Sequence, residues 1–580
     1  MTKRQKVWLW VLAGVVLLIG VGFVCSDAII SHMVNKKLKE ALQAEERFSI
    51  SYKYIAVMMG SRTVELRGLD FSTAPAEMKD AAEEAAAEYK PAVHVYVDRV
   101  SVRLISLLDL IRDRQVNIHQ IVIDEPEVTL RLPLDQKALN SKDKKQAATA
   151  DTVKANMPIK SIAVGKIKVK DGSLRLSDAK SKLDVSLDDL RLVANDLGYD
   201  IQKGEFTYND SLYQFSLEDL SFTTPDGLMH IDLKSLDTKD AKEVTLTNLH
   251  CFNTVEKLQL ADIKGKVPST WIDVTLKKIQ TSPVNIIRQA MNKEISIDRV
   301  SVEGSKGLAF RDVRYPPKYP SGMPQEAMLK MPIPLHIKKV NMSMPEFDVE
   351  LSTLNINRGL LVVKNVSGTL TNVTNKKGEK LHAKVHAALS HGGEGNVNLM
   401  LKMDKASHFE FEAKFKDVQG ESFNQFLHPL FGAEAYFTID SLTTHYTGDN
   451  KRADGDFCMV YKDIQVHIIK EDAPYNLIAK NAETINILAP AVLQRHNPRI
   501  IGQKPQSYAV SKERDVLEEF PIYLIGPMLD GVLKTLLPGF IVRTIDKQTS
   551  KKAEQHAEQF GQKKQKPAQK PLMQTTKKAK

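Results

Sequence analysis

The sequence is poor in residues that define several protein classes. Only three cysteines, Cys25, Cys251 and Cys458, occur in 580 residues. At most one disulfide could therefore join Cys251 to Cys458, and the chain is not a disulfide scaffold. Aromatic residues make up 7% of the chain. The net charge is +10, but the basic residues are not interleaved with aromatic residues as they are on a nucleic-acid-binding surface. We therefore expect no nucleic-acid partner.

Sequence motifs of enzymes and metal sites are also absent. There is no phosphate-binding glycine loop, no HExxH or CxxC pair and no GxSxG motif. The segment HGGEG at residues 391–395 has the composition of a hairpin turn. Asp449, Asp454 and Asp456 lack the spacing of a calcium loop. We therefore predict a protein that is not an enzyme and that holds no metal and no cofactor.

The N-terminus predicts a membrane span. Lys3, Arg4 and Lys6 precede an uncharged run at residues 7–26, whose length as a helix is about 30 Å, the thickness of a bilayer core. The positive-inside rule places residues 1–6 in the cytoplasm and the rest of the chain across the membrane. A cleaved signal peptide is the alternative, because Ser26 and Ala28 form a marginal cleavage site.

Most of the remaining sequence has the pattern of β-strands. After an amphipathic helix at residues 27–47, apolar and polar residues alternate in short runs separated by turn residues. The apolar positions of residues 93–97 and 100–104 are out of phase, which predicts a bulge between them. The pattern therefore favours a mainly antiparallel β fold.

Two segments of the chain repeat each other. Asp98 to Val102, DRVSV, recurs unchanged at residues 298–302. Each copy leads into the pattern I-x-x-[IV]-x-[IM]-x-x-P-E, at residues 118–127 and 337–346, and a weaker third copy starts at Ile159. Repeated strand units indicate an elongated sheet that grows by addition, not a compact enzyme built around one cleft.

Parts of the chain resemble a known family. With the N-terminal span, residues 93–132, VHVYVDRVSVRLISLLDLIRDRQVNIHQIVIDEPEVTLRL, resemble the first unit of AsmA-like envelope proteins of Gram-negative bacteria. These are relatives of TamB and, more distantly, of eukaryotic bridge-like lipid transfer proteins. Residues 409–469 resemble the closing strands of the family, and residues 448–461 are similar to a hairpin of its members from Bacteroidetes.

The resemblance implies a sheet bent into an open groove, anchored in the inner membrane and projecting through the periplasm, through which phospholipids move toward the outer membrane. Independently, alternating strands create one apolar face, and few amphipathic helices are available to cover it. That face must close on another sheet or hold lipid chains. The candidate groove-lining residues are Val100, Val102, Leu104, Ile121 and Ile123 in the first repeat, and Val300, Val302, Val340 and Met342 in the second.

The expected fold is a single transmembrane helix followed by an elongated, twisted antiparallel β-sheet that forms an open, taco-like groove with short capping helices. The expected segments are a cytoplasmic N-terminus (1–6), the span (7–26), an amphipathic helix (27–47), an AsmA-like β unit (48–132), a flexible excursion (133–157), a β-groove (158–490, with the second repeat near 295–350), a helical segment (491–545) and a basic disordered tail (546–580). Residues 520–540 within the helical segment either cap the last strand or lie in a membrane interface.

We therefore expect a single-pass inner-membrane protein with its body in the periplasm, which binds and transfers lipid and maintains the outer membrane. Its expected partners are phospholipids or other envelope lipids, the inner membrane, and outer-membrane or periplasmic proteins. The main alternative is a structural scaffold that assists the assembly of outer-membrane proteins and conducts no lipid. A third hypothesis is an enzyme that acts on envelope lipid or glycan.

Overall fold

The computed structural model describes residues 49–58, 61–72, 92–106, 115–131, 161–178, 183–200, 205–207, 213–239, 243–285, 288–289, 292–352, 358–469, 493–500, 502–537, 543 and 555–556. The chain divides into two compact units. The N-terminal unit comprises Met1–Glu256 and Ile272–Lys306, and the C-terminal unit comprises Lys257–Trp271 and Gly307–Lys580. The expected span at 7–26, the helix at 27–47, the excursion at 133–157 and most of the tail lie outside the described residues.

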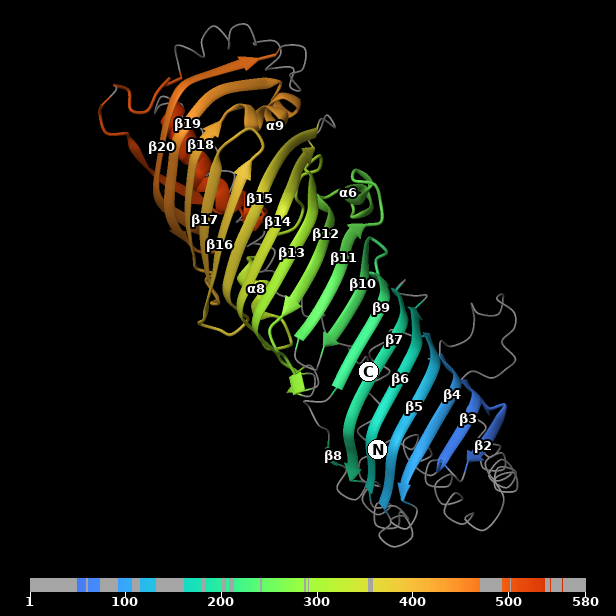
Figure 1. The fold of residues 1–580 in the computed structure, drawn as a ribbon. Helices are drawn as coiled ribbons and strands as arrows, with labels where there is room; N and C mark the ends of the chain where they lie inside the picture. Colours follow the sequence, from blue (N-terminus) through green and yellow to red (C-terminus); the bar gives the residue numbers. More distant parts are fainter. Residues whose placement is uncertain are drawn as a thin grey trace, which may run out of the picture. The chain divides into compact units, whose positions relative to one another are not determined.

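The N-terminal unit contains an open sheet whose strands pair mostly in chain order (Figure 1). β1 and β2 both pair with β3, and pairing then runs from β3 through β7 to β9 and on to β12, with β8 also against β7. The strands are β1 (Ser49–Ser51), β2 (Tyr54–Met58), β3 (Thr63–Ser72), β4 (Ala92–Ser106), β5 (Gln115–Arg131), β6 (Ser161–Asp178), β7 (Leu183–Asp200), β8 (Glu205–Thr207), β9 (Tyr213–Thr223), β10 (Met229–Lys239) and β11 (Glu243–Asn253).

One pairing in this unit differs from the expected antiparallel arrangement. β5 and β6 are parallel, with Ile121 opposite Ile167 and Ile123 opposite Val169. Parallel neighbours cannot be joined by a tight hairpin and require a long crossover connection. The connection between these two strands, residues 132–160, has the length that such a crossover requires.

The C-terminal unit contains a second run of antiparallel pairs, from β14 to β21 in chain order. β12 (Ser269–Thr281) and β13 (Ile295–Asp312) each contribute residues to both units. The remaining elements are α6 (Gln259–Ile263), α8 (Pro324–Leu329), β14 (Leu335–Ser352), β15 (Arg358–Thr374), β16 (Lys380–Leu389), β17 (Glu394–Lys402), β18 (Phe409–Gln419), α9 (Glu421–Phe431), β19 (Ala433–Gly448), β20 (Arg452–Ile468), β21 (Ser507–Glu513) and α11 (Phe520–Leu536).

The mainly β class and the open, mostly antiparallel sheet are confirmed. Among the described helices of the C-terminal unit, α9 contacts β15 and β19, and α11 contacts β20 and β21 (Figure 1). The largest fully buried side chains of the described residues lie in this unit, and they include Tyr446, Phe457 and Tyr523.

Left-handed residues recur inside the strands. They occupy the third position of apolar-x-x-apolar segments, as in Asp219, Asn248, Asp417 and Asp463, whose φ angles lie between 48° and 52°. Asp and Asn tolerate this conformation better than most residues. In a regular strand, residues three apart face opposite sides of the sheet. A left-handed residue between them bends the strand, as in a β-bulge, and brings both apolar residues to one face.

The phase slip at residues 97–100 of β4 is not the bulge that we expected. The pairing of β4 with β5 is continuous through Val97 and Arg99 and shifts only around Leu104. On the neighbouring strand β5, Glu125 lies opposite Asp98 and has a φ of 49°. The left-handed residue therefore lies on β5, opposite the phase slip of β4, and the register of the two strands is unchanged.

Candidate functional site

A partly open cavity of about 660 Å³ lies in the C-terminal unit, between its sheet and the helices α9 and α11. Its wall is formed by β15 to β20 and by one face of each helix. The lining residues are Leu361, Val363, Val385, Ala387, Leu389, Gly395, Val397, Phe415, Val418, Phe423, Phe426, Leu427, Ala435, Phe437, Ile439, Leu442, Met459, Tyr461, Ile464, Val466, Met528, Leu529, Val532 and Leu536.

Bends in the strands shape the sheet side of this wall. Phe415 and Val418 both line the cavity although they are three residues apart on β18, and Asp417 between them is left-handed, with φ 52°. Tyr461 and Ile464 repeat this arrangement on β20 around Asp463. Each bend therefore adds a second apolar side chain to the same wall.

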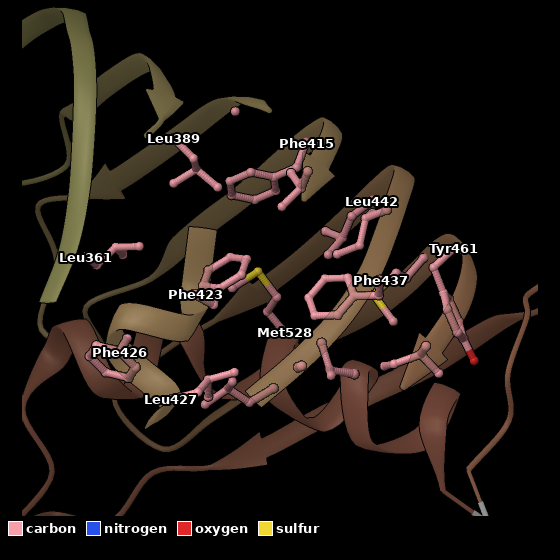
Figure 2. Close-up of a pocket in the computed structure, with 18 of the residues that line it drawn as sticks. Leu361, Leu389, Phe415, Phe423, Phe426, Leu427, Phe437, Leu442, Tyr461 and Met528 are labelled. Carbon is pink, nitrogen blue, oxygen red and sulfur yellow. The ribbon is translucent and has the colours of Figure 1, made fainter. Parts of the chain in front are cut away.

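The helix α9 contributes Phe423, Phe426 and Leu427 to the cavity wall. These residues fall at helical spacing and therefore lie on one side of the helix. Gly420 immediately precedes the helix. A Cβ atom there would lie 2.7 Å from the carbonyl oxygen of Ala435, so only glycine allows this close approach. The Phe423 ring stacks on Phe437 of β19, with centroids 6.3 Å apart and planes 19° apart. Met528 is drawn near both rings in Figure 2, and all three side chains line the cavity.

The helix α11 closes another side of the cavity. At Gly531 a Cβ atom would come within 2.2 Å of Phe457 on β20, so the helix and the strand approach too closely for any side chain there. Asp530 is buried and binds both the backbone N–H of Ser511, at 3.0 Å, and the ammonium of Lys534, at 2.7 Å. The Tyr446 hydroxyl donates a hydrogen bond to the carbonyl of Leu524. These contacts fix the helix, and thereby Met528 and Val532, against the sheet.

The cavity wall carries almost no polar chemistry. Tyr461 is the one lining residue with a polar side chain, and its hydroxyl donates to the backbone carbonyl of Gln494. Burial raises the pKa of Tyr461, which keeps the phenol protonated. In Figure 2 its oxygen points away from the other labelled side chains. The wall thus offers no acid, base or nucleophile to a bound molecule, and it can bind through apolar contact.

The groove candidates of the first repeat form cross-strand rows in the N-terminal unit. Val100 lies opposite Ile123, and Val102 lies opposite Ile121. Leu104 is buried, at 6% exposure, and the other four are half-buried. The structure therefore brings these side chains together, but none of them lines the cavity.

The candidates of the second repeat are split between the units. Val300 and Val302 lie on β13 in the N-terminal unit, and Val340 and Met342 lie on β14 in the C-terminal unit. Met342 is 36% exposed and the others are half-buried. None of these residues lines the cavity either, and their role in lipid contact stays a prediction.

The strand pattern expected for residues 409–469 does not predict the cavity. The structure places a helix, α9, inside that segment. The signal was present in the sequence, since Phe423, Phe426 and Leu427 in FNQFLHPLF have the i, i+3, i+4 spacing of an apolar helix face.

Within the described ranges, the helices fall short of the combined length and hydropathy of a membrane span. The span predicted at residues 7–26 lies outside these ranges and stays a prediction. The described residues also hold no group of three or more His, Cys, Asp or Glu side chains placed to bind a metal ion. No model of a known protein family matches the chain, and no curated protein is similar to it in sequence at a significant level.

Proposed function

We propose that this chain is a membrane-anchored lipid-binding protein of the cell envelope, which transfers phospholipid between the inner and outer membranes without covalent chemistry. The observation that carries the proposal is the cavity of about 660 Å³ whose wall contains a single polar side chain. Its volume falls in the range of about 300–1,000 Å³ typical of small-molecule sites. Its wall lacks the converging polar groups that orient a polar substrate, so an aliphatic chain is the ligand it fits.

The energetics favour an acyl chain as the occupant. Each methylene group moved from water into such a wall contributes about 0.8 kcal/mol. Several methylene groups therefore hold a lipid without a specific headgroup pocket. Because this attraction is non-directional, a chain can also slide along an apolar surface without breaking hydrogen bonds, as transfer requires.

The sequence supports the rest of the proposal. The basic N-terminus and uncharged run at residues 1–26 favour an inner-membrane anchor with the body in the periplasm. The repeated strand units and the resemblance to AsmA-like proteins favour an elongated sheet whose apolar face serves as a groove. On this proposal, the row formed by Val100, Val102, Ile121 and Ile123 is a further part of the lipid path.

A pair of neighbouring alanines on β16 tests the proposal. Ala387 lines the cavity, whereas the next residue, Ala388, faces the other side of the strand. We would purify the full chain, Ala387→Trp and Ala388→Trp in amphipol, which adds no lipid, and count phospholipids per chain by mass spectrometry. The indole of Ala387→Trp should occupy the cavity and remove lipid, and Ala388→Trp should retain the wild-type amount.

Lipid bound around a membrane span is common to all three chains, so the difference between the variants reports the cavity. Equal lipid in all three, with unchanged thermal unfolding, contradicts lipid binding in the cavity. That result would favour the scaffold that assists outer-membrane protein assembly.

A further inference from the structure

The outward side of α11 is apolar throughout. Its exposed residues are Pro521, Ile522, Ile525 and Leu529, and the last three are 41%, 40% and 50% exposed. They fall at the i, i+3, i+7 spacing that places them on one stripe of a helix. We refer to Ile522, Ile525 and Leu529 as the α11 stripe.

The polarity of this helix is the reverse of that of a helix at a water surface, which turns its polar side outward. Asp530 and Thr535 are buried, at 9% and 1% exposure, and each has a hydrogen-bond partner. The charged side chain of Lys534 is 24% exposed and is paired with Asp530. The close approach of Gly531 to Phe457 explains why the inward side has no side chain at this position. No such close approach accounts for the outward stripe, whose first residue, Ile522, also lines a second cavity with Arg311 and Glu519.

The stripe is continuous with the cavity. Leu529 lines the cavity and is also half exposed, so it lies at the cavity's rim. Ile522 and Ile525 extend the apolar surface from this rim along the helix, over a length of about 10 Å at 1.5 Å per residue. A lipid leaving the cavity at Leu529 would meet the stripe next.

The sequence that follows α11 is strongly basic. Residues 538–580 contain eleven Lys or Arg against three Asp or Glu. Basic residues near an anionic membrane surface contribute about 1 kcal/mol each. A helix with an apolar outward stripe and a basic continuation has the features of a segment that lies in the interface of an anionic bilayer.

We propose that the α11 stripe docks on the surface of an anionic phospholipid bilayer and holds the rim of the cavity at that bilayer. This inference rests on the proposed function, because it identifies where lipid enters or leaves the cavity. The sequence left two roles open for residues 520–540, as a cap of the last strand or as an interfacial helix. On this proposal α11 has both: one side packs on β20 and β21, and the other side contacts lipid.

The test uses the full chain in nanodiscs, so that any membrane span is already occupied. We would add vesicles of phosphatidylcholine and phosphatidylglycerol and measure flotation of the chain with them. The test variant is Ile522→Ser/Ile525→Ser. The matched control is Met331→Ser/Ile333→Ser, since these two apolar residues of the same unit are both 42% exposed.

The wild-type chain and the control should float with the anionic vesicles, and the test variant should bind them roughly tenfold more weakly because it loses two partly buried side chains. Wild-type binding should fall with pure phosphatidylcholine vesicles and with added salt. Equal flotation of the test variant and the control overturns the proposal. Light scattering provides a second check. If the wild-type chain self-associates and the test variant does not, the stripe binds a second copy of the chain, and the proposal is also overturned.

Docking and cavity binding can fail separately. Ala387→Trp should float as the wild type does, because the indole lies inside the cavity, and Ile522→Ser/Ile525→Ser should keep its bound lipid. If Ala387→Trp retains lipid while the stripe variant loses flotation, the proposed function fails and docking stands. If the stripe variant floats normally while Ala387→Trp loses lipid, docking fails and the cavity stands.

Discussion

Phe415 and Val418, three residues apart on β18, line the same wall of the cavity because Asp417 between them is left-handed. Strict alternation would have turned one of them to the opposite side of the sheet. The cavity wall thus depends on a backbone bend at a residue that does not itself touch the cavity.

Replacing Asp417 with valine should therefore destabilise the C-terminal unit. A left-handed conformation costs an L-residue about 1–2 kcal/mol, and β-branched residues tolerate it least. We expect Asp417→Val to lower the free energy of unfolding by about that amount in urea titrations and to reduce bound lipid. Asp417→Gly, which accepts positive φ, should keep both. Equal stability of the valine and glycine variants would show that the bend is not required.

Tyr446 connects the sheet to α11 through a buried hydrogen bond. Its side chain is fully buried, and its hydroxyl donates to the carbonyl of Leu524. Tyr446→Phe keeps the ring but leaves that carbonyl without this donor, at a cost of about 1–3 kcal/mol. Chemical denaturation should show this loss. Phe411→Leu nearby serves as a packing control, because it removes ring contacts and leaves the hydrogen bond intact.

The turn between β17 and β18 should weaken in acid. Burial alone would raise the pKa of Asp404, but hydrogen bonds from the side chain and backbone of His408 and from Lys402 lower it to about 2. The carboxyl of an unfolded Asp has a pKa of about 3.9. The lowered value therefore stabilises the fold above pH 4, and this stabilisation is lost as the pH falls toward 2.

We expect a contribution of about 1 kcal/mol after solvent screening. Unfolding free energies of the wild type and Asp404→Asn, compared between pH 5 and pH 2, should differ at the upper pH and converge at the lower one. A constant difference across this range would mean that the carboxylate charge contributes nothing.

Val102 in the N-terminal unit tests whether lipid contact extends beyond the cavity. Val102 is half-buried in an apolar row with Ile121. Val102→Asp should reduce the rate of phospholipid transfer between membranes several-fold while the protein still folds and inserts. Ser101→Asp, on the opposite side of the same strand, is the matched control. If Val102→Asp fails to fold, the row is a dry core and not a groove.

The sequence predicted the fold class because hydrophobic alternation reports local burial directly. The first repeat falls on β4 and β5, and the second falls on β13 and β14. Each strand contains the apolar residue that predicted it, in this order: Val102, Ile121, Val302 and Val340. The parallel pairing of β5 with β6 was not predicted, since alternation says which side of a strand is apolar and not which direction its neighbour runs.

The site was harder to predict than the fold. The cavity joins side chains from β15, β19, α9 and α11, such as Leu361, Phe437, Phe423 and Met528, and no local pattern reports contacts between segments so far apart in the chain. The bends at Asp417 and Asp463 were visible as Asp or Asn inside apolar-x-x-apolar segments. Their consequence is that two apolar residues three positions apart line one wall, and this could be seen only from the backbone angles.

The most direct measurement is photo-crosslinking in intact cells at two neighbouring residues of β16. Val385 lines the cavity, and Lys384 is exposed on the other side of the strand. With a photoreactive residue at each position in turn, lipid mass spectrometry of the isolated chain should recover phospholipid attached at position 385 and little at 384. Equal recovery at both positions, or none at either with the chain abundant and anchored, would contradict the claim that the cavity holds lipid.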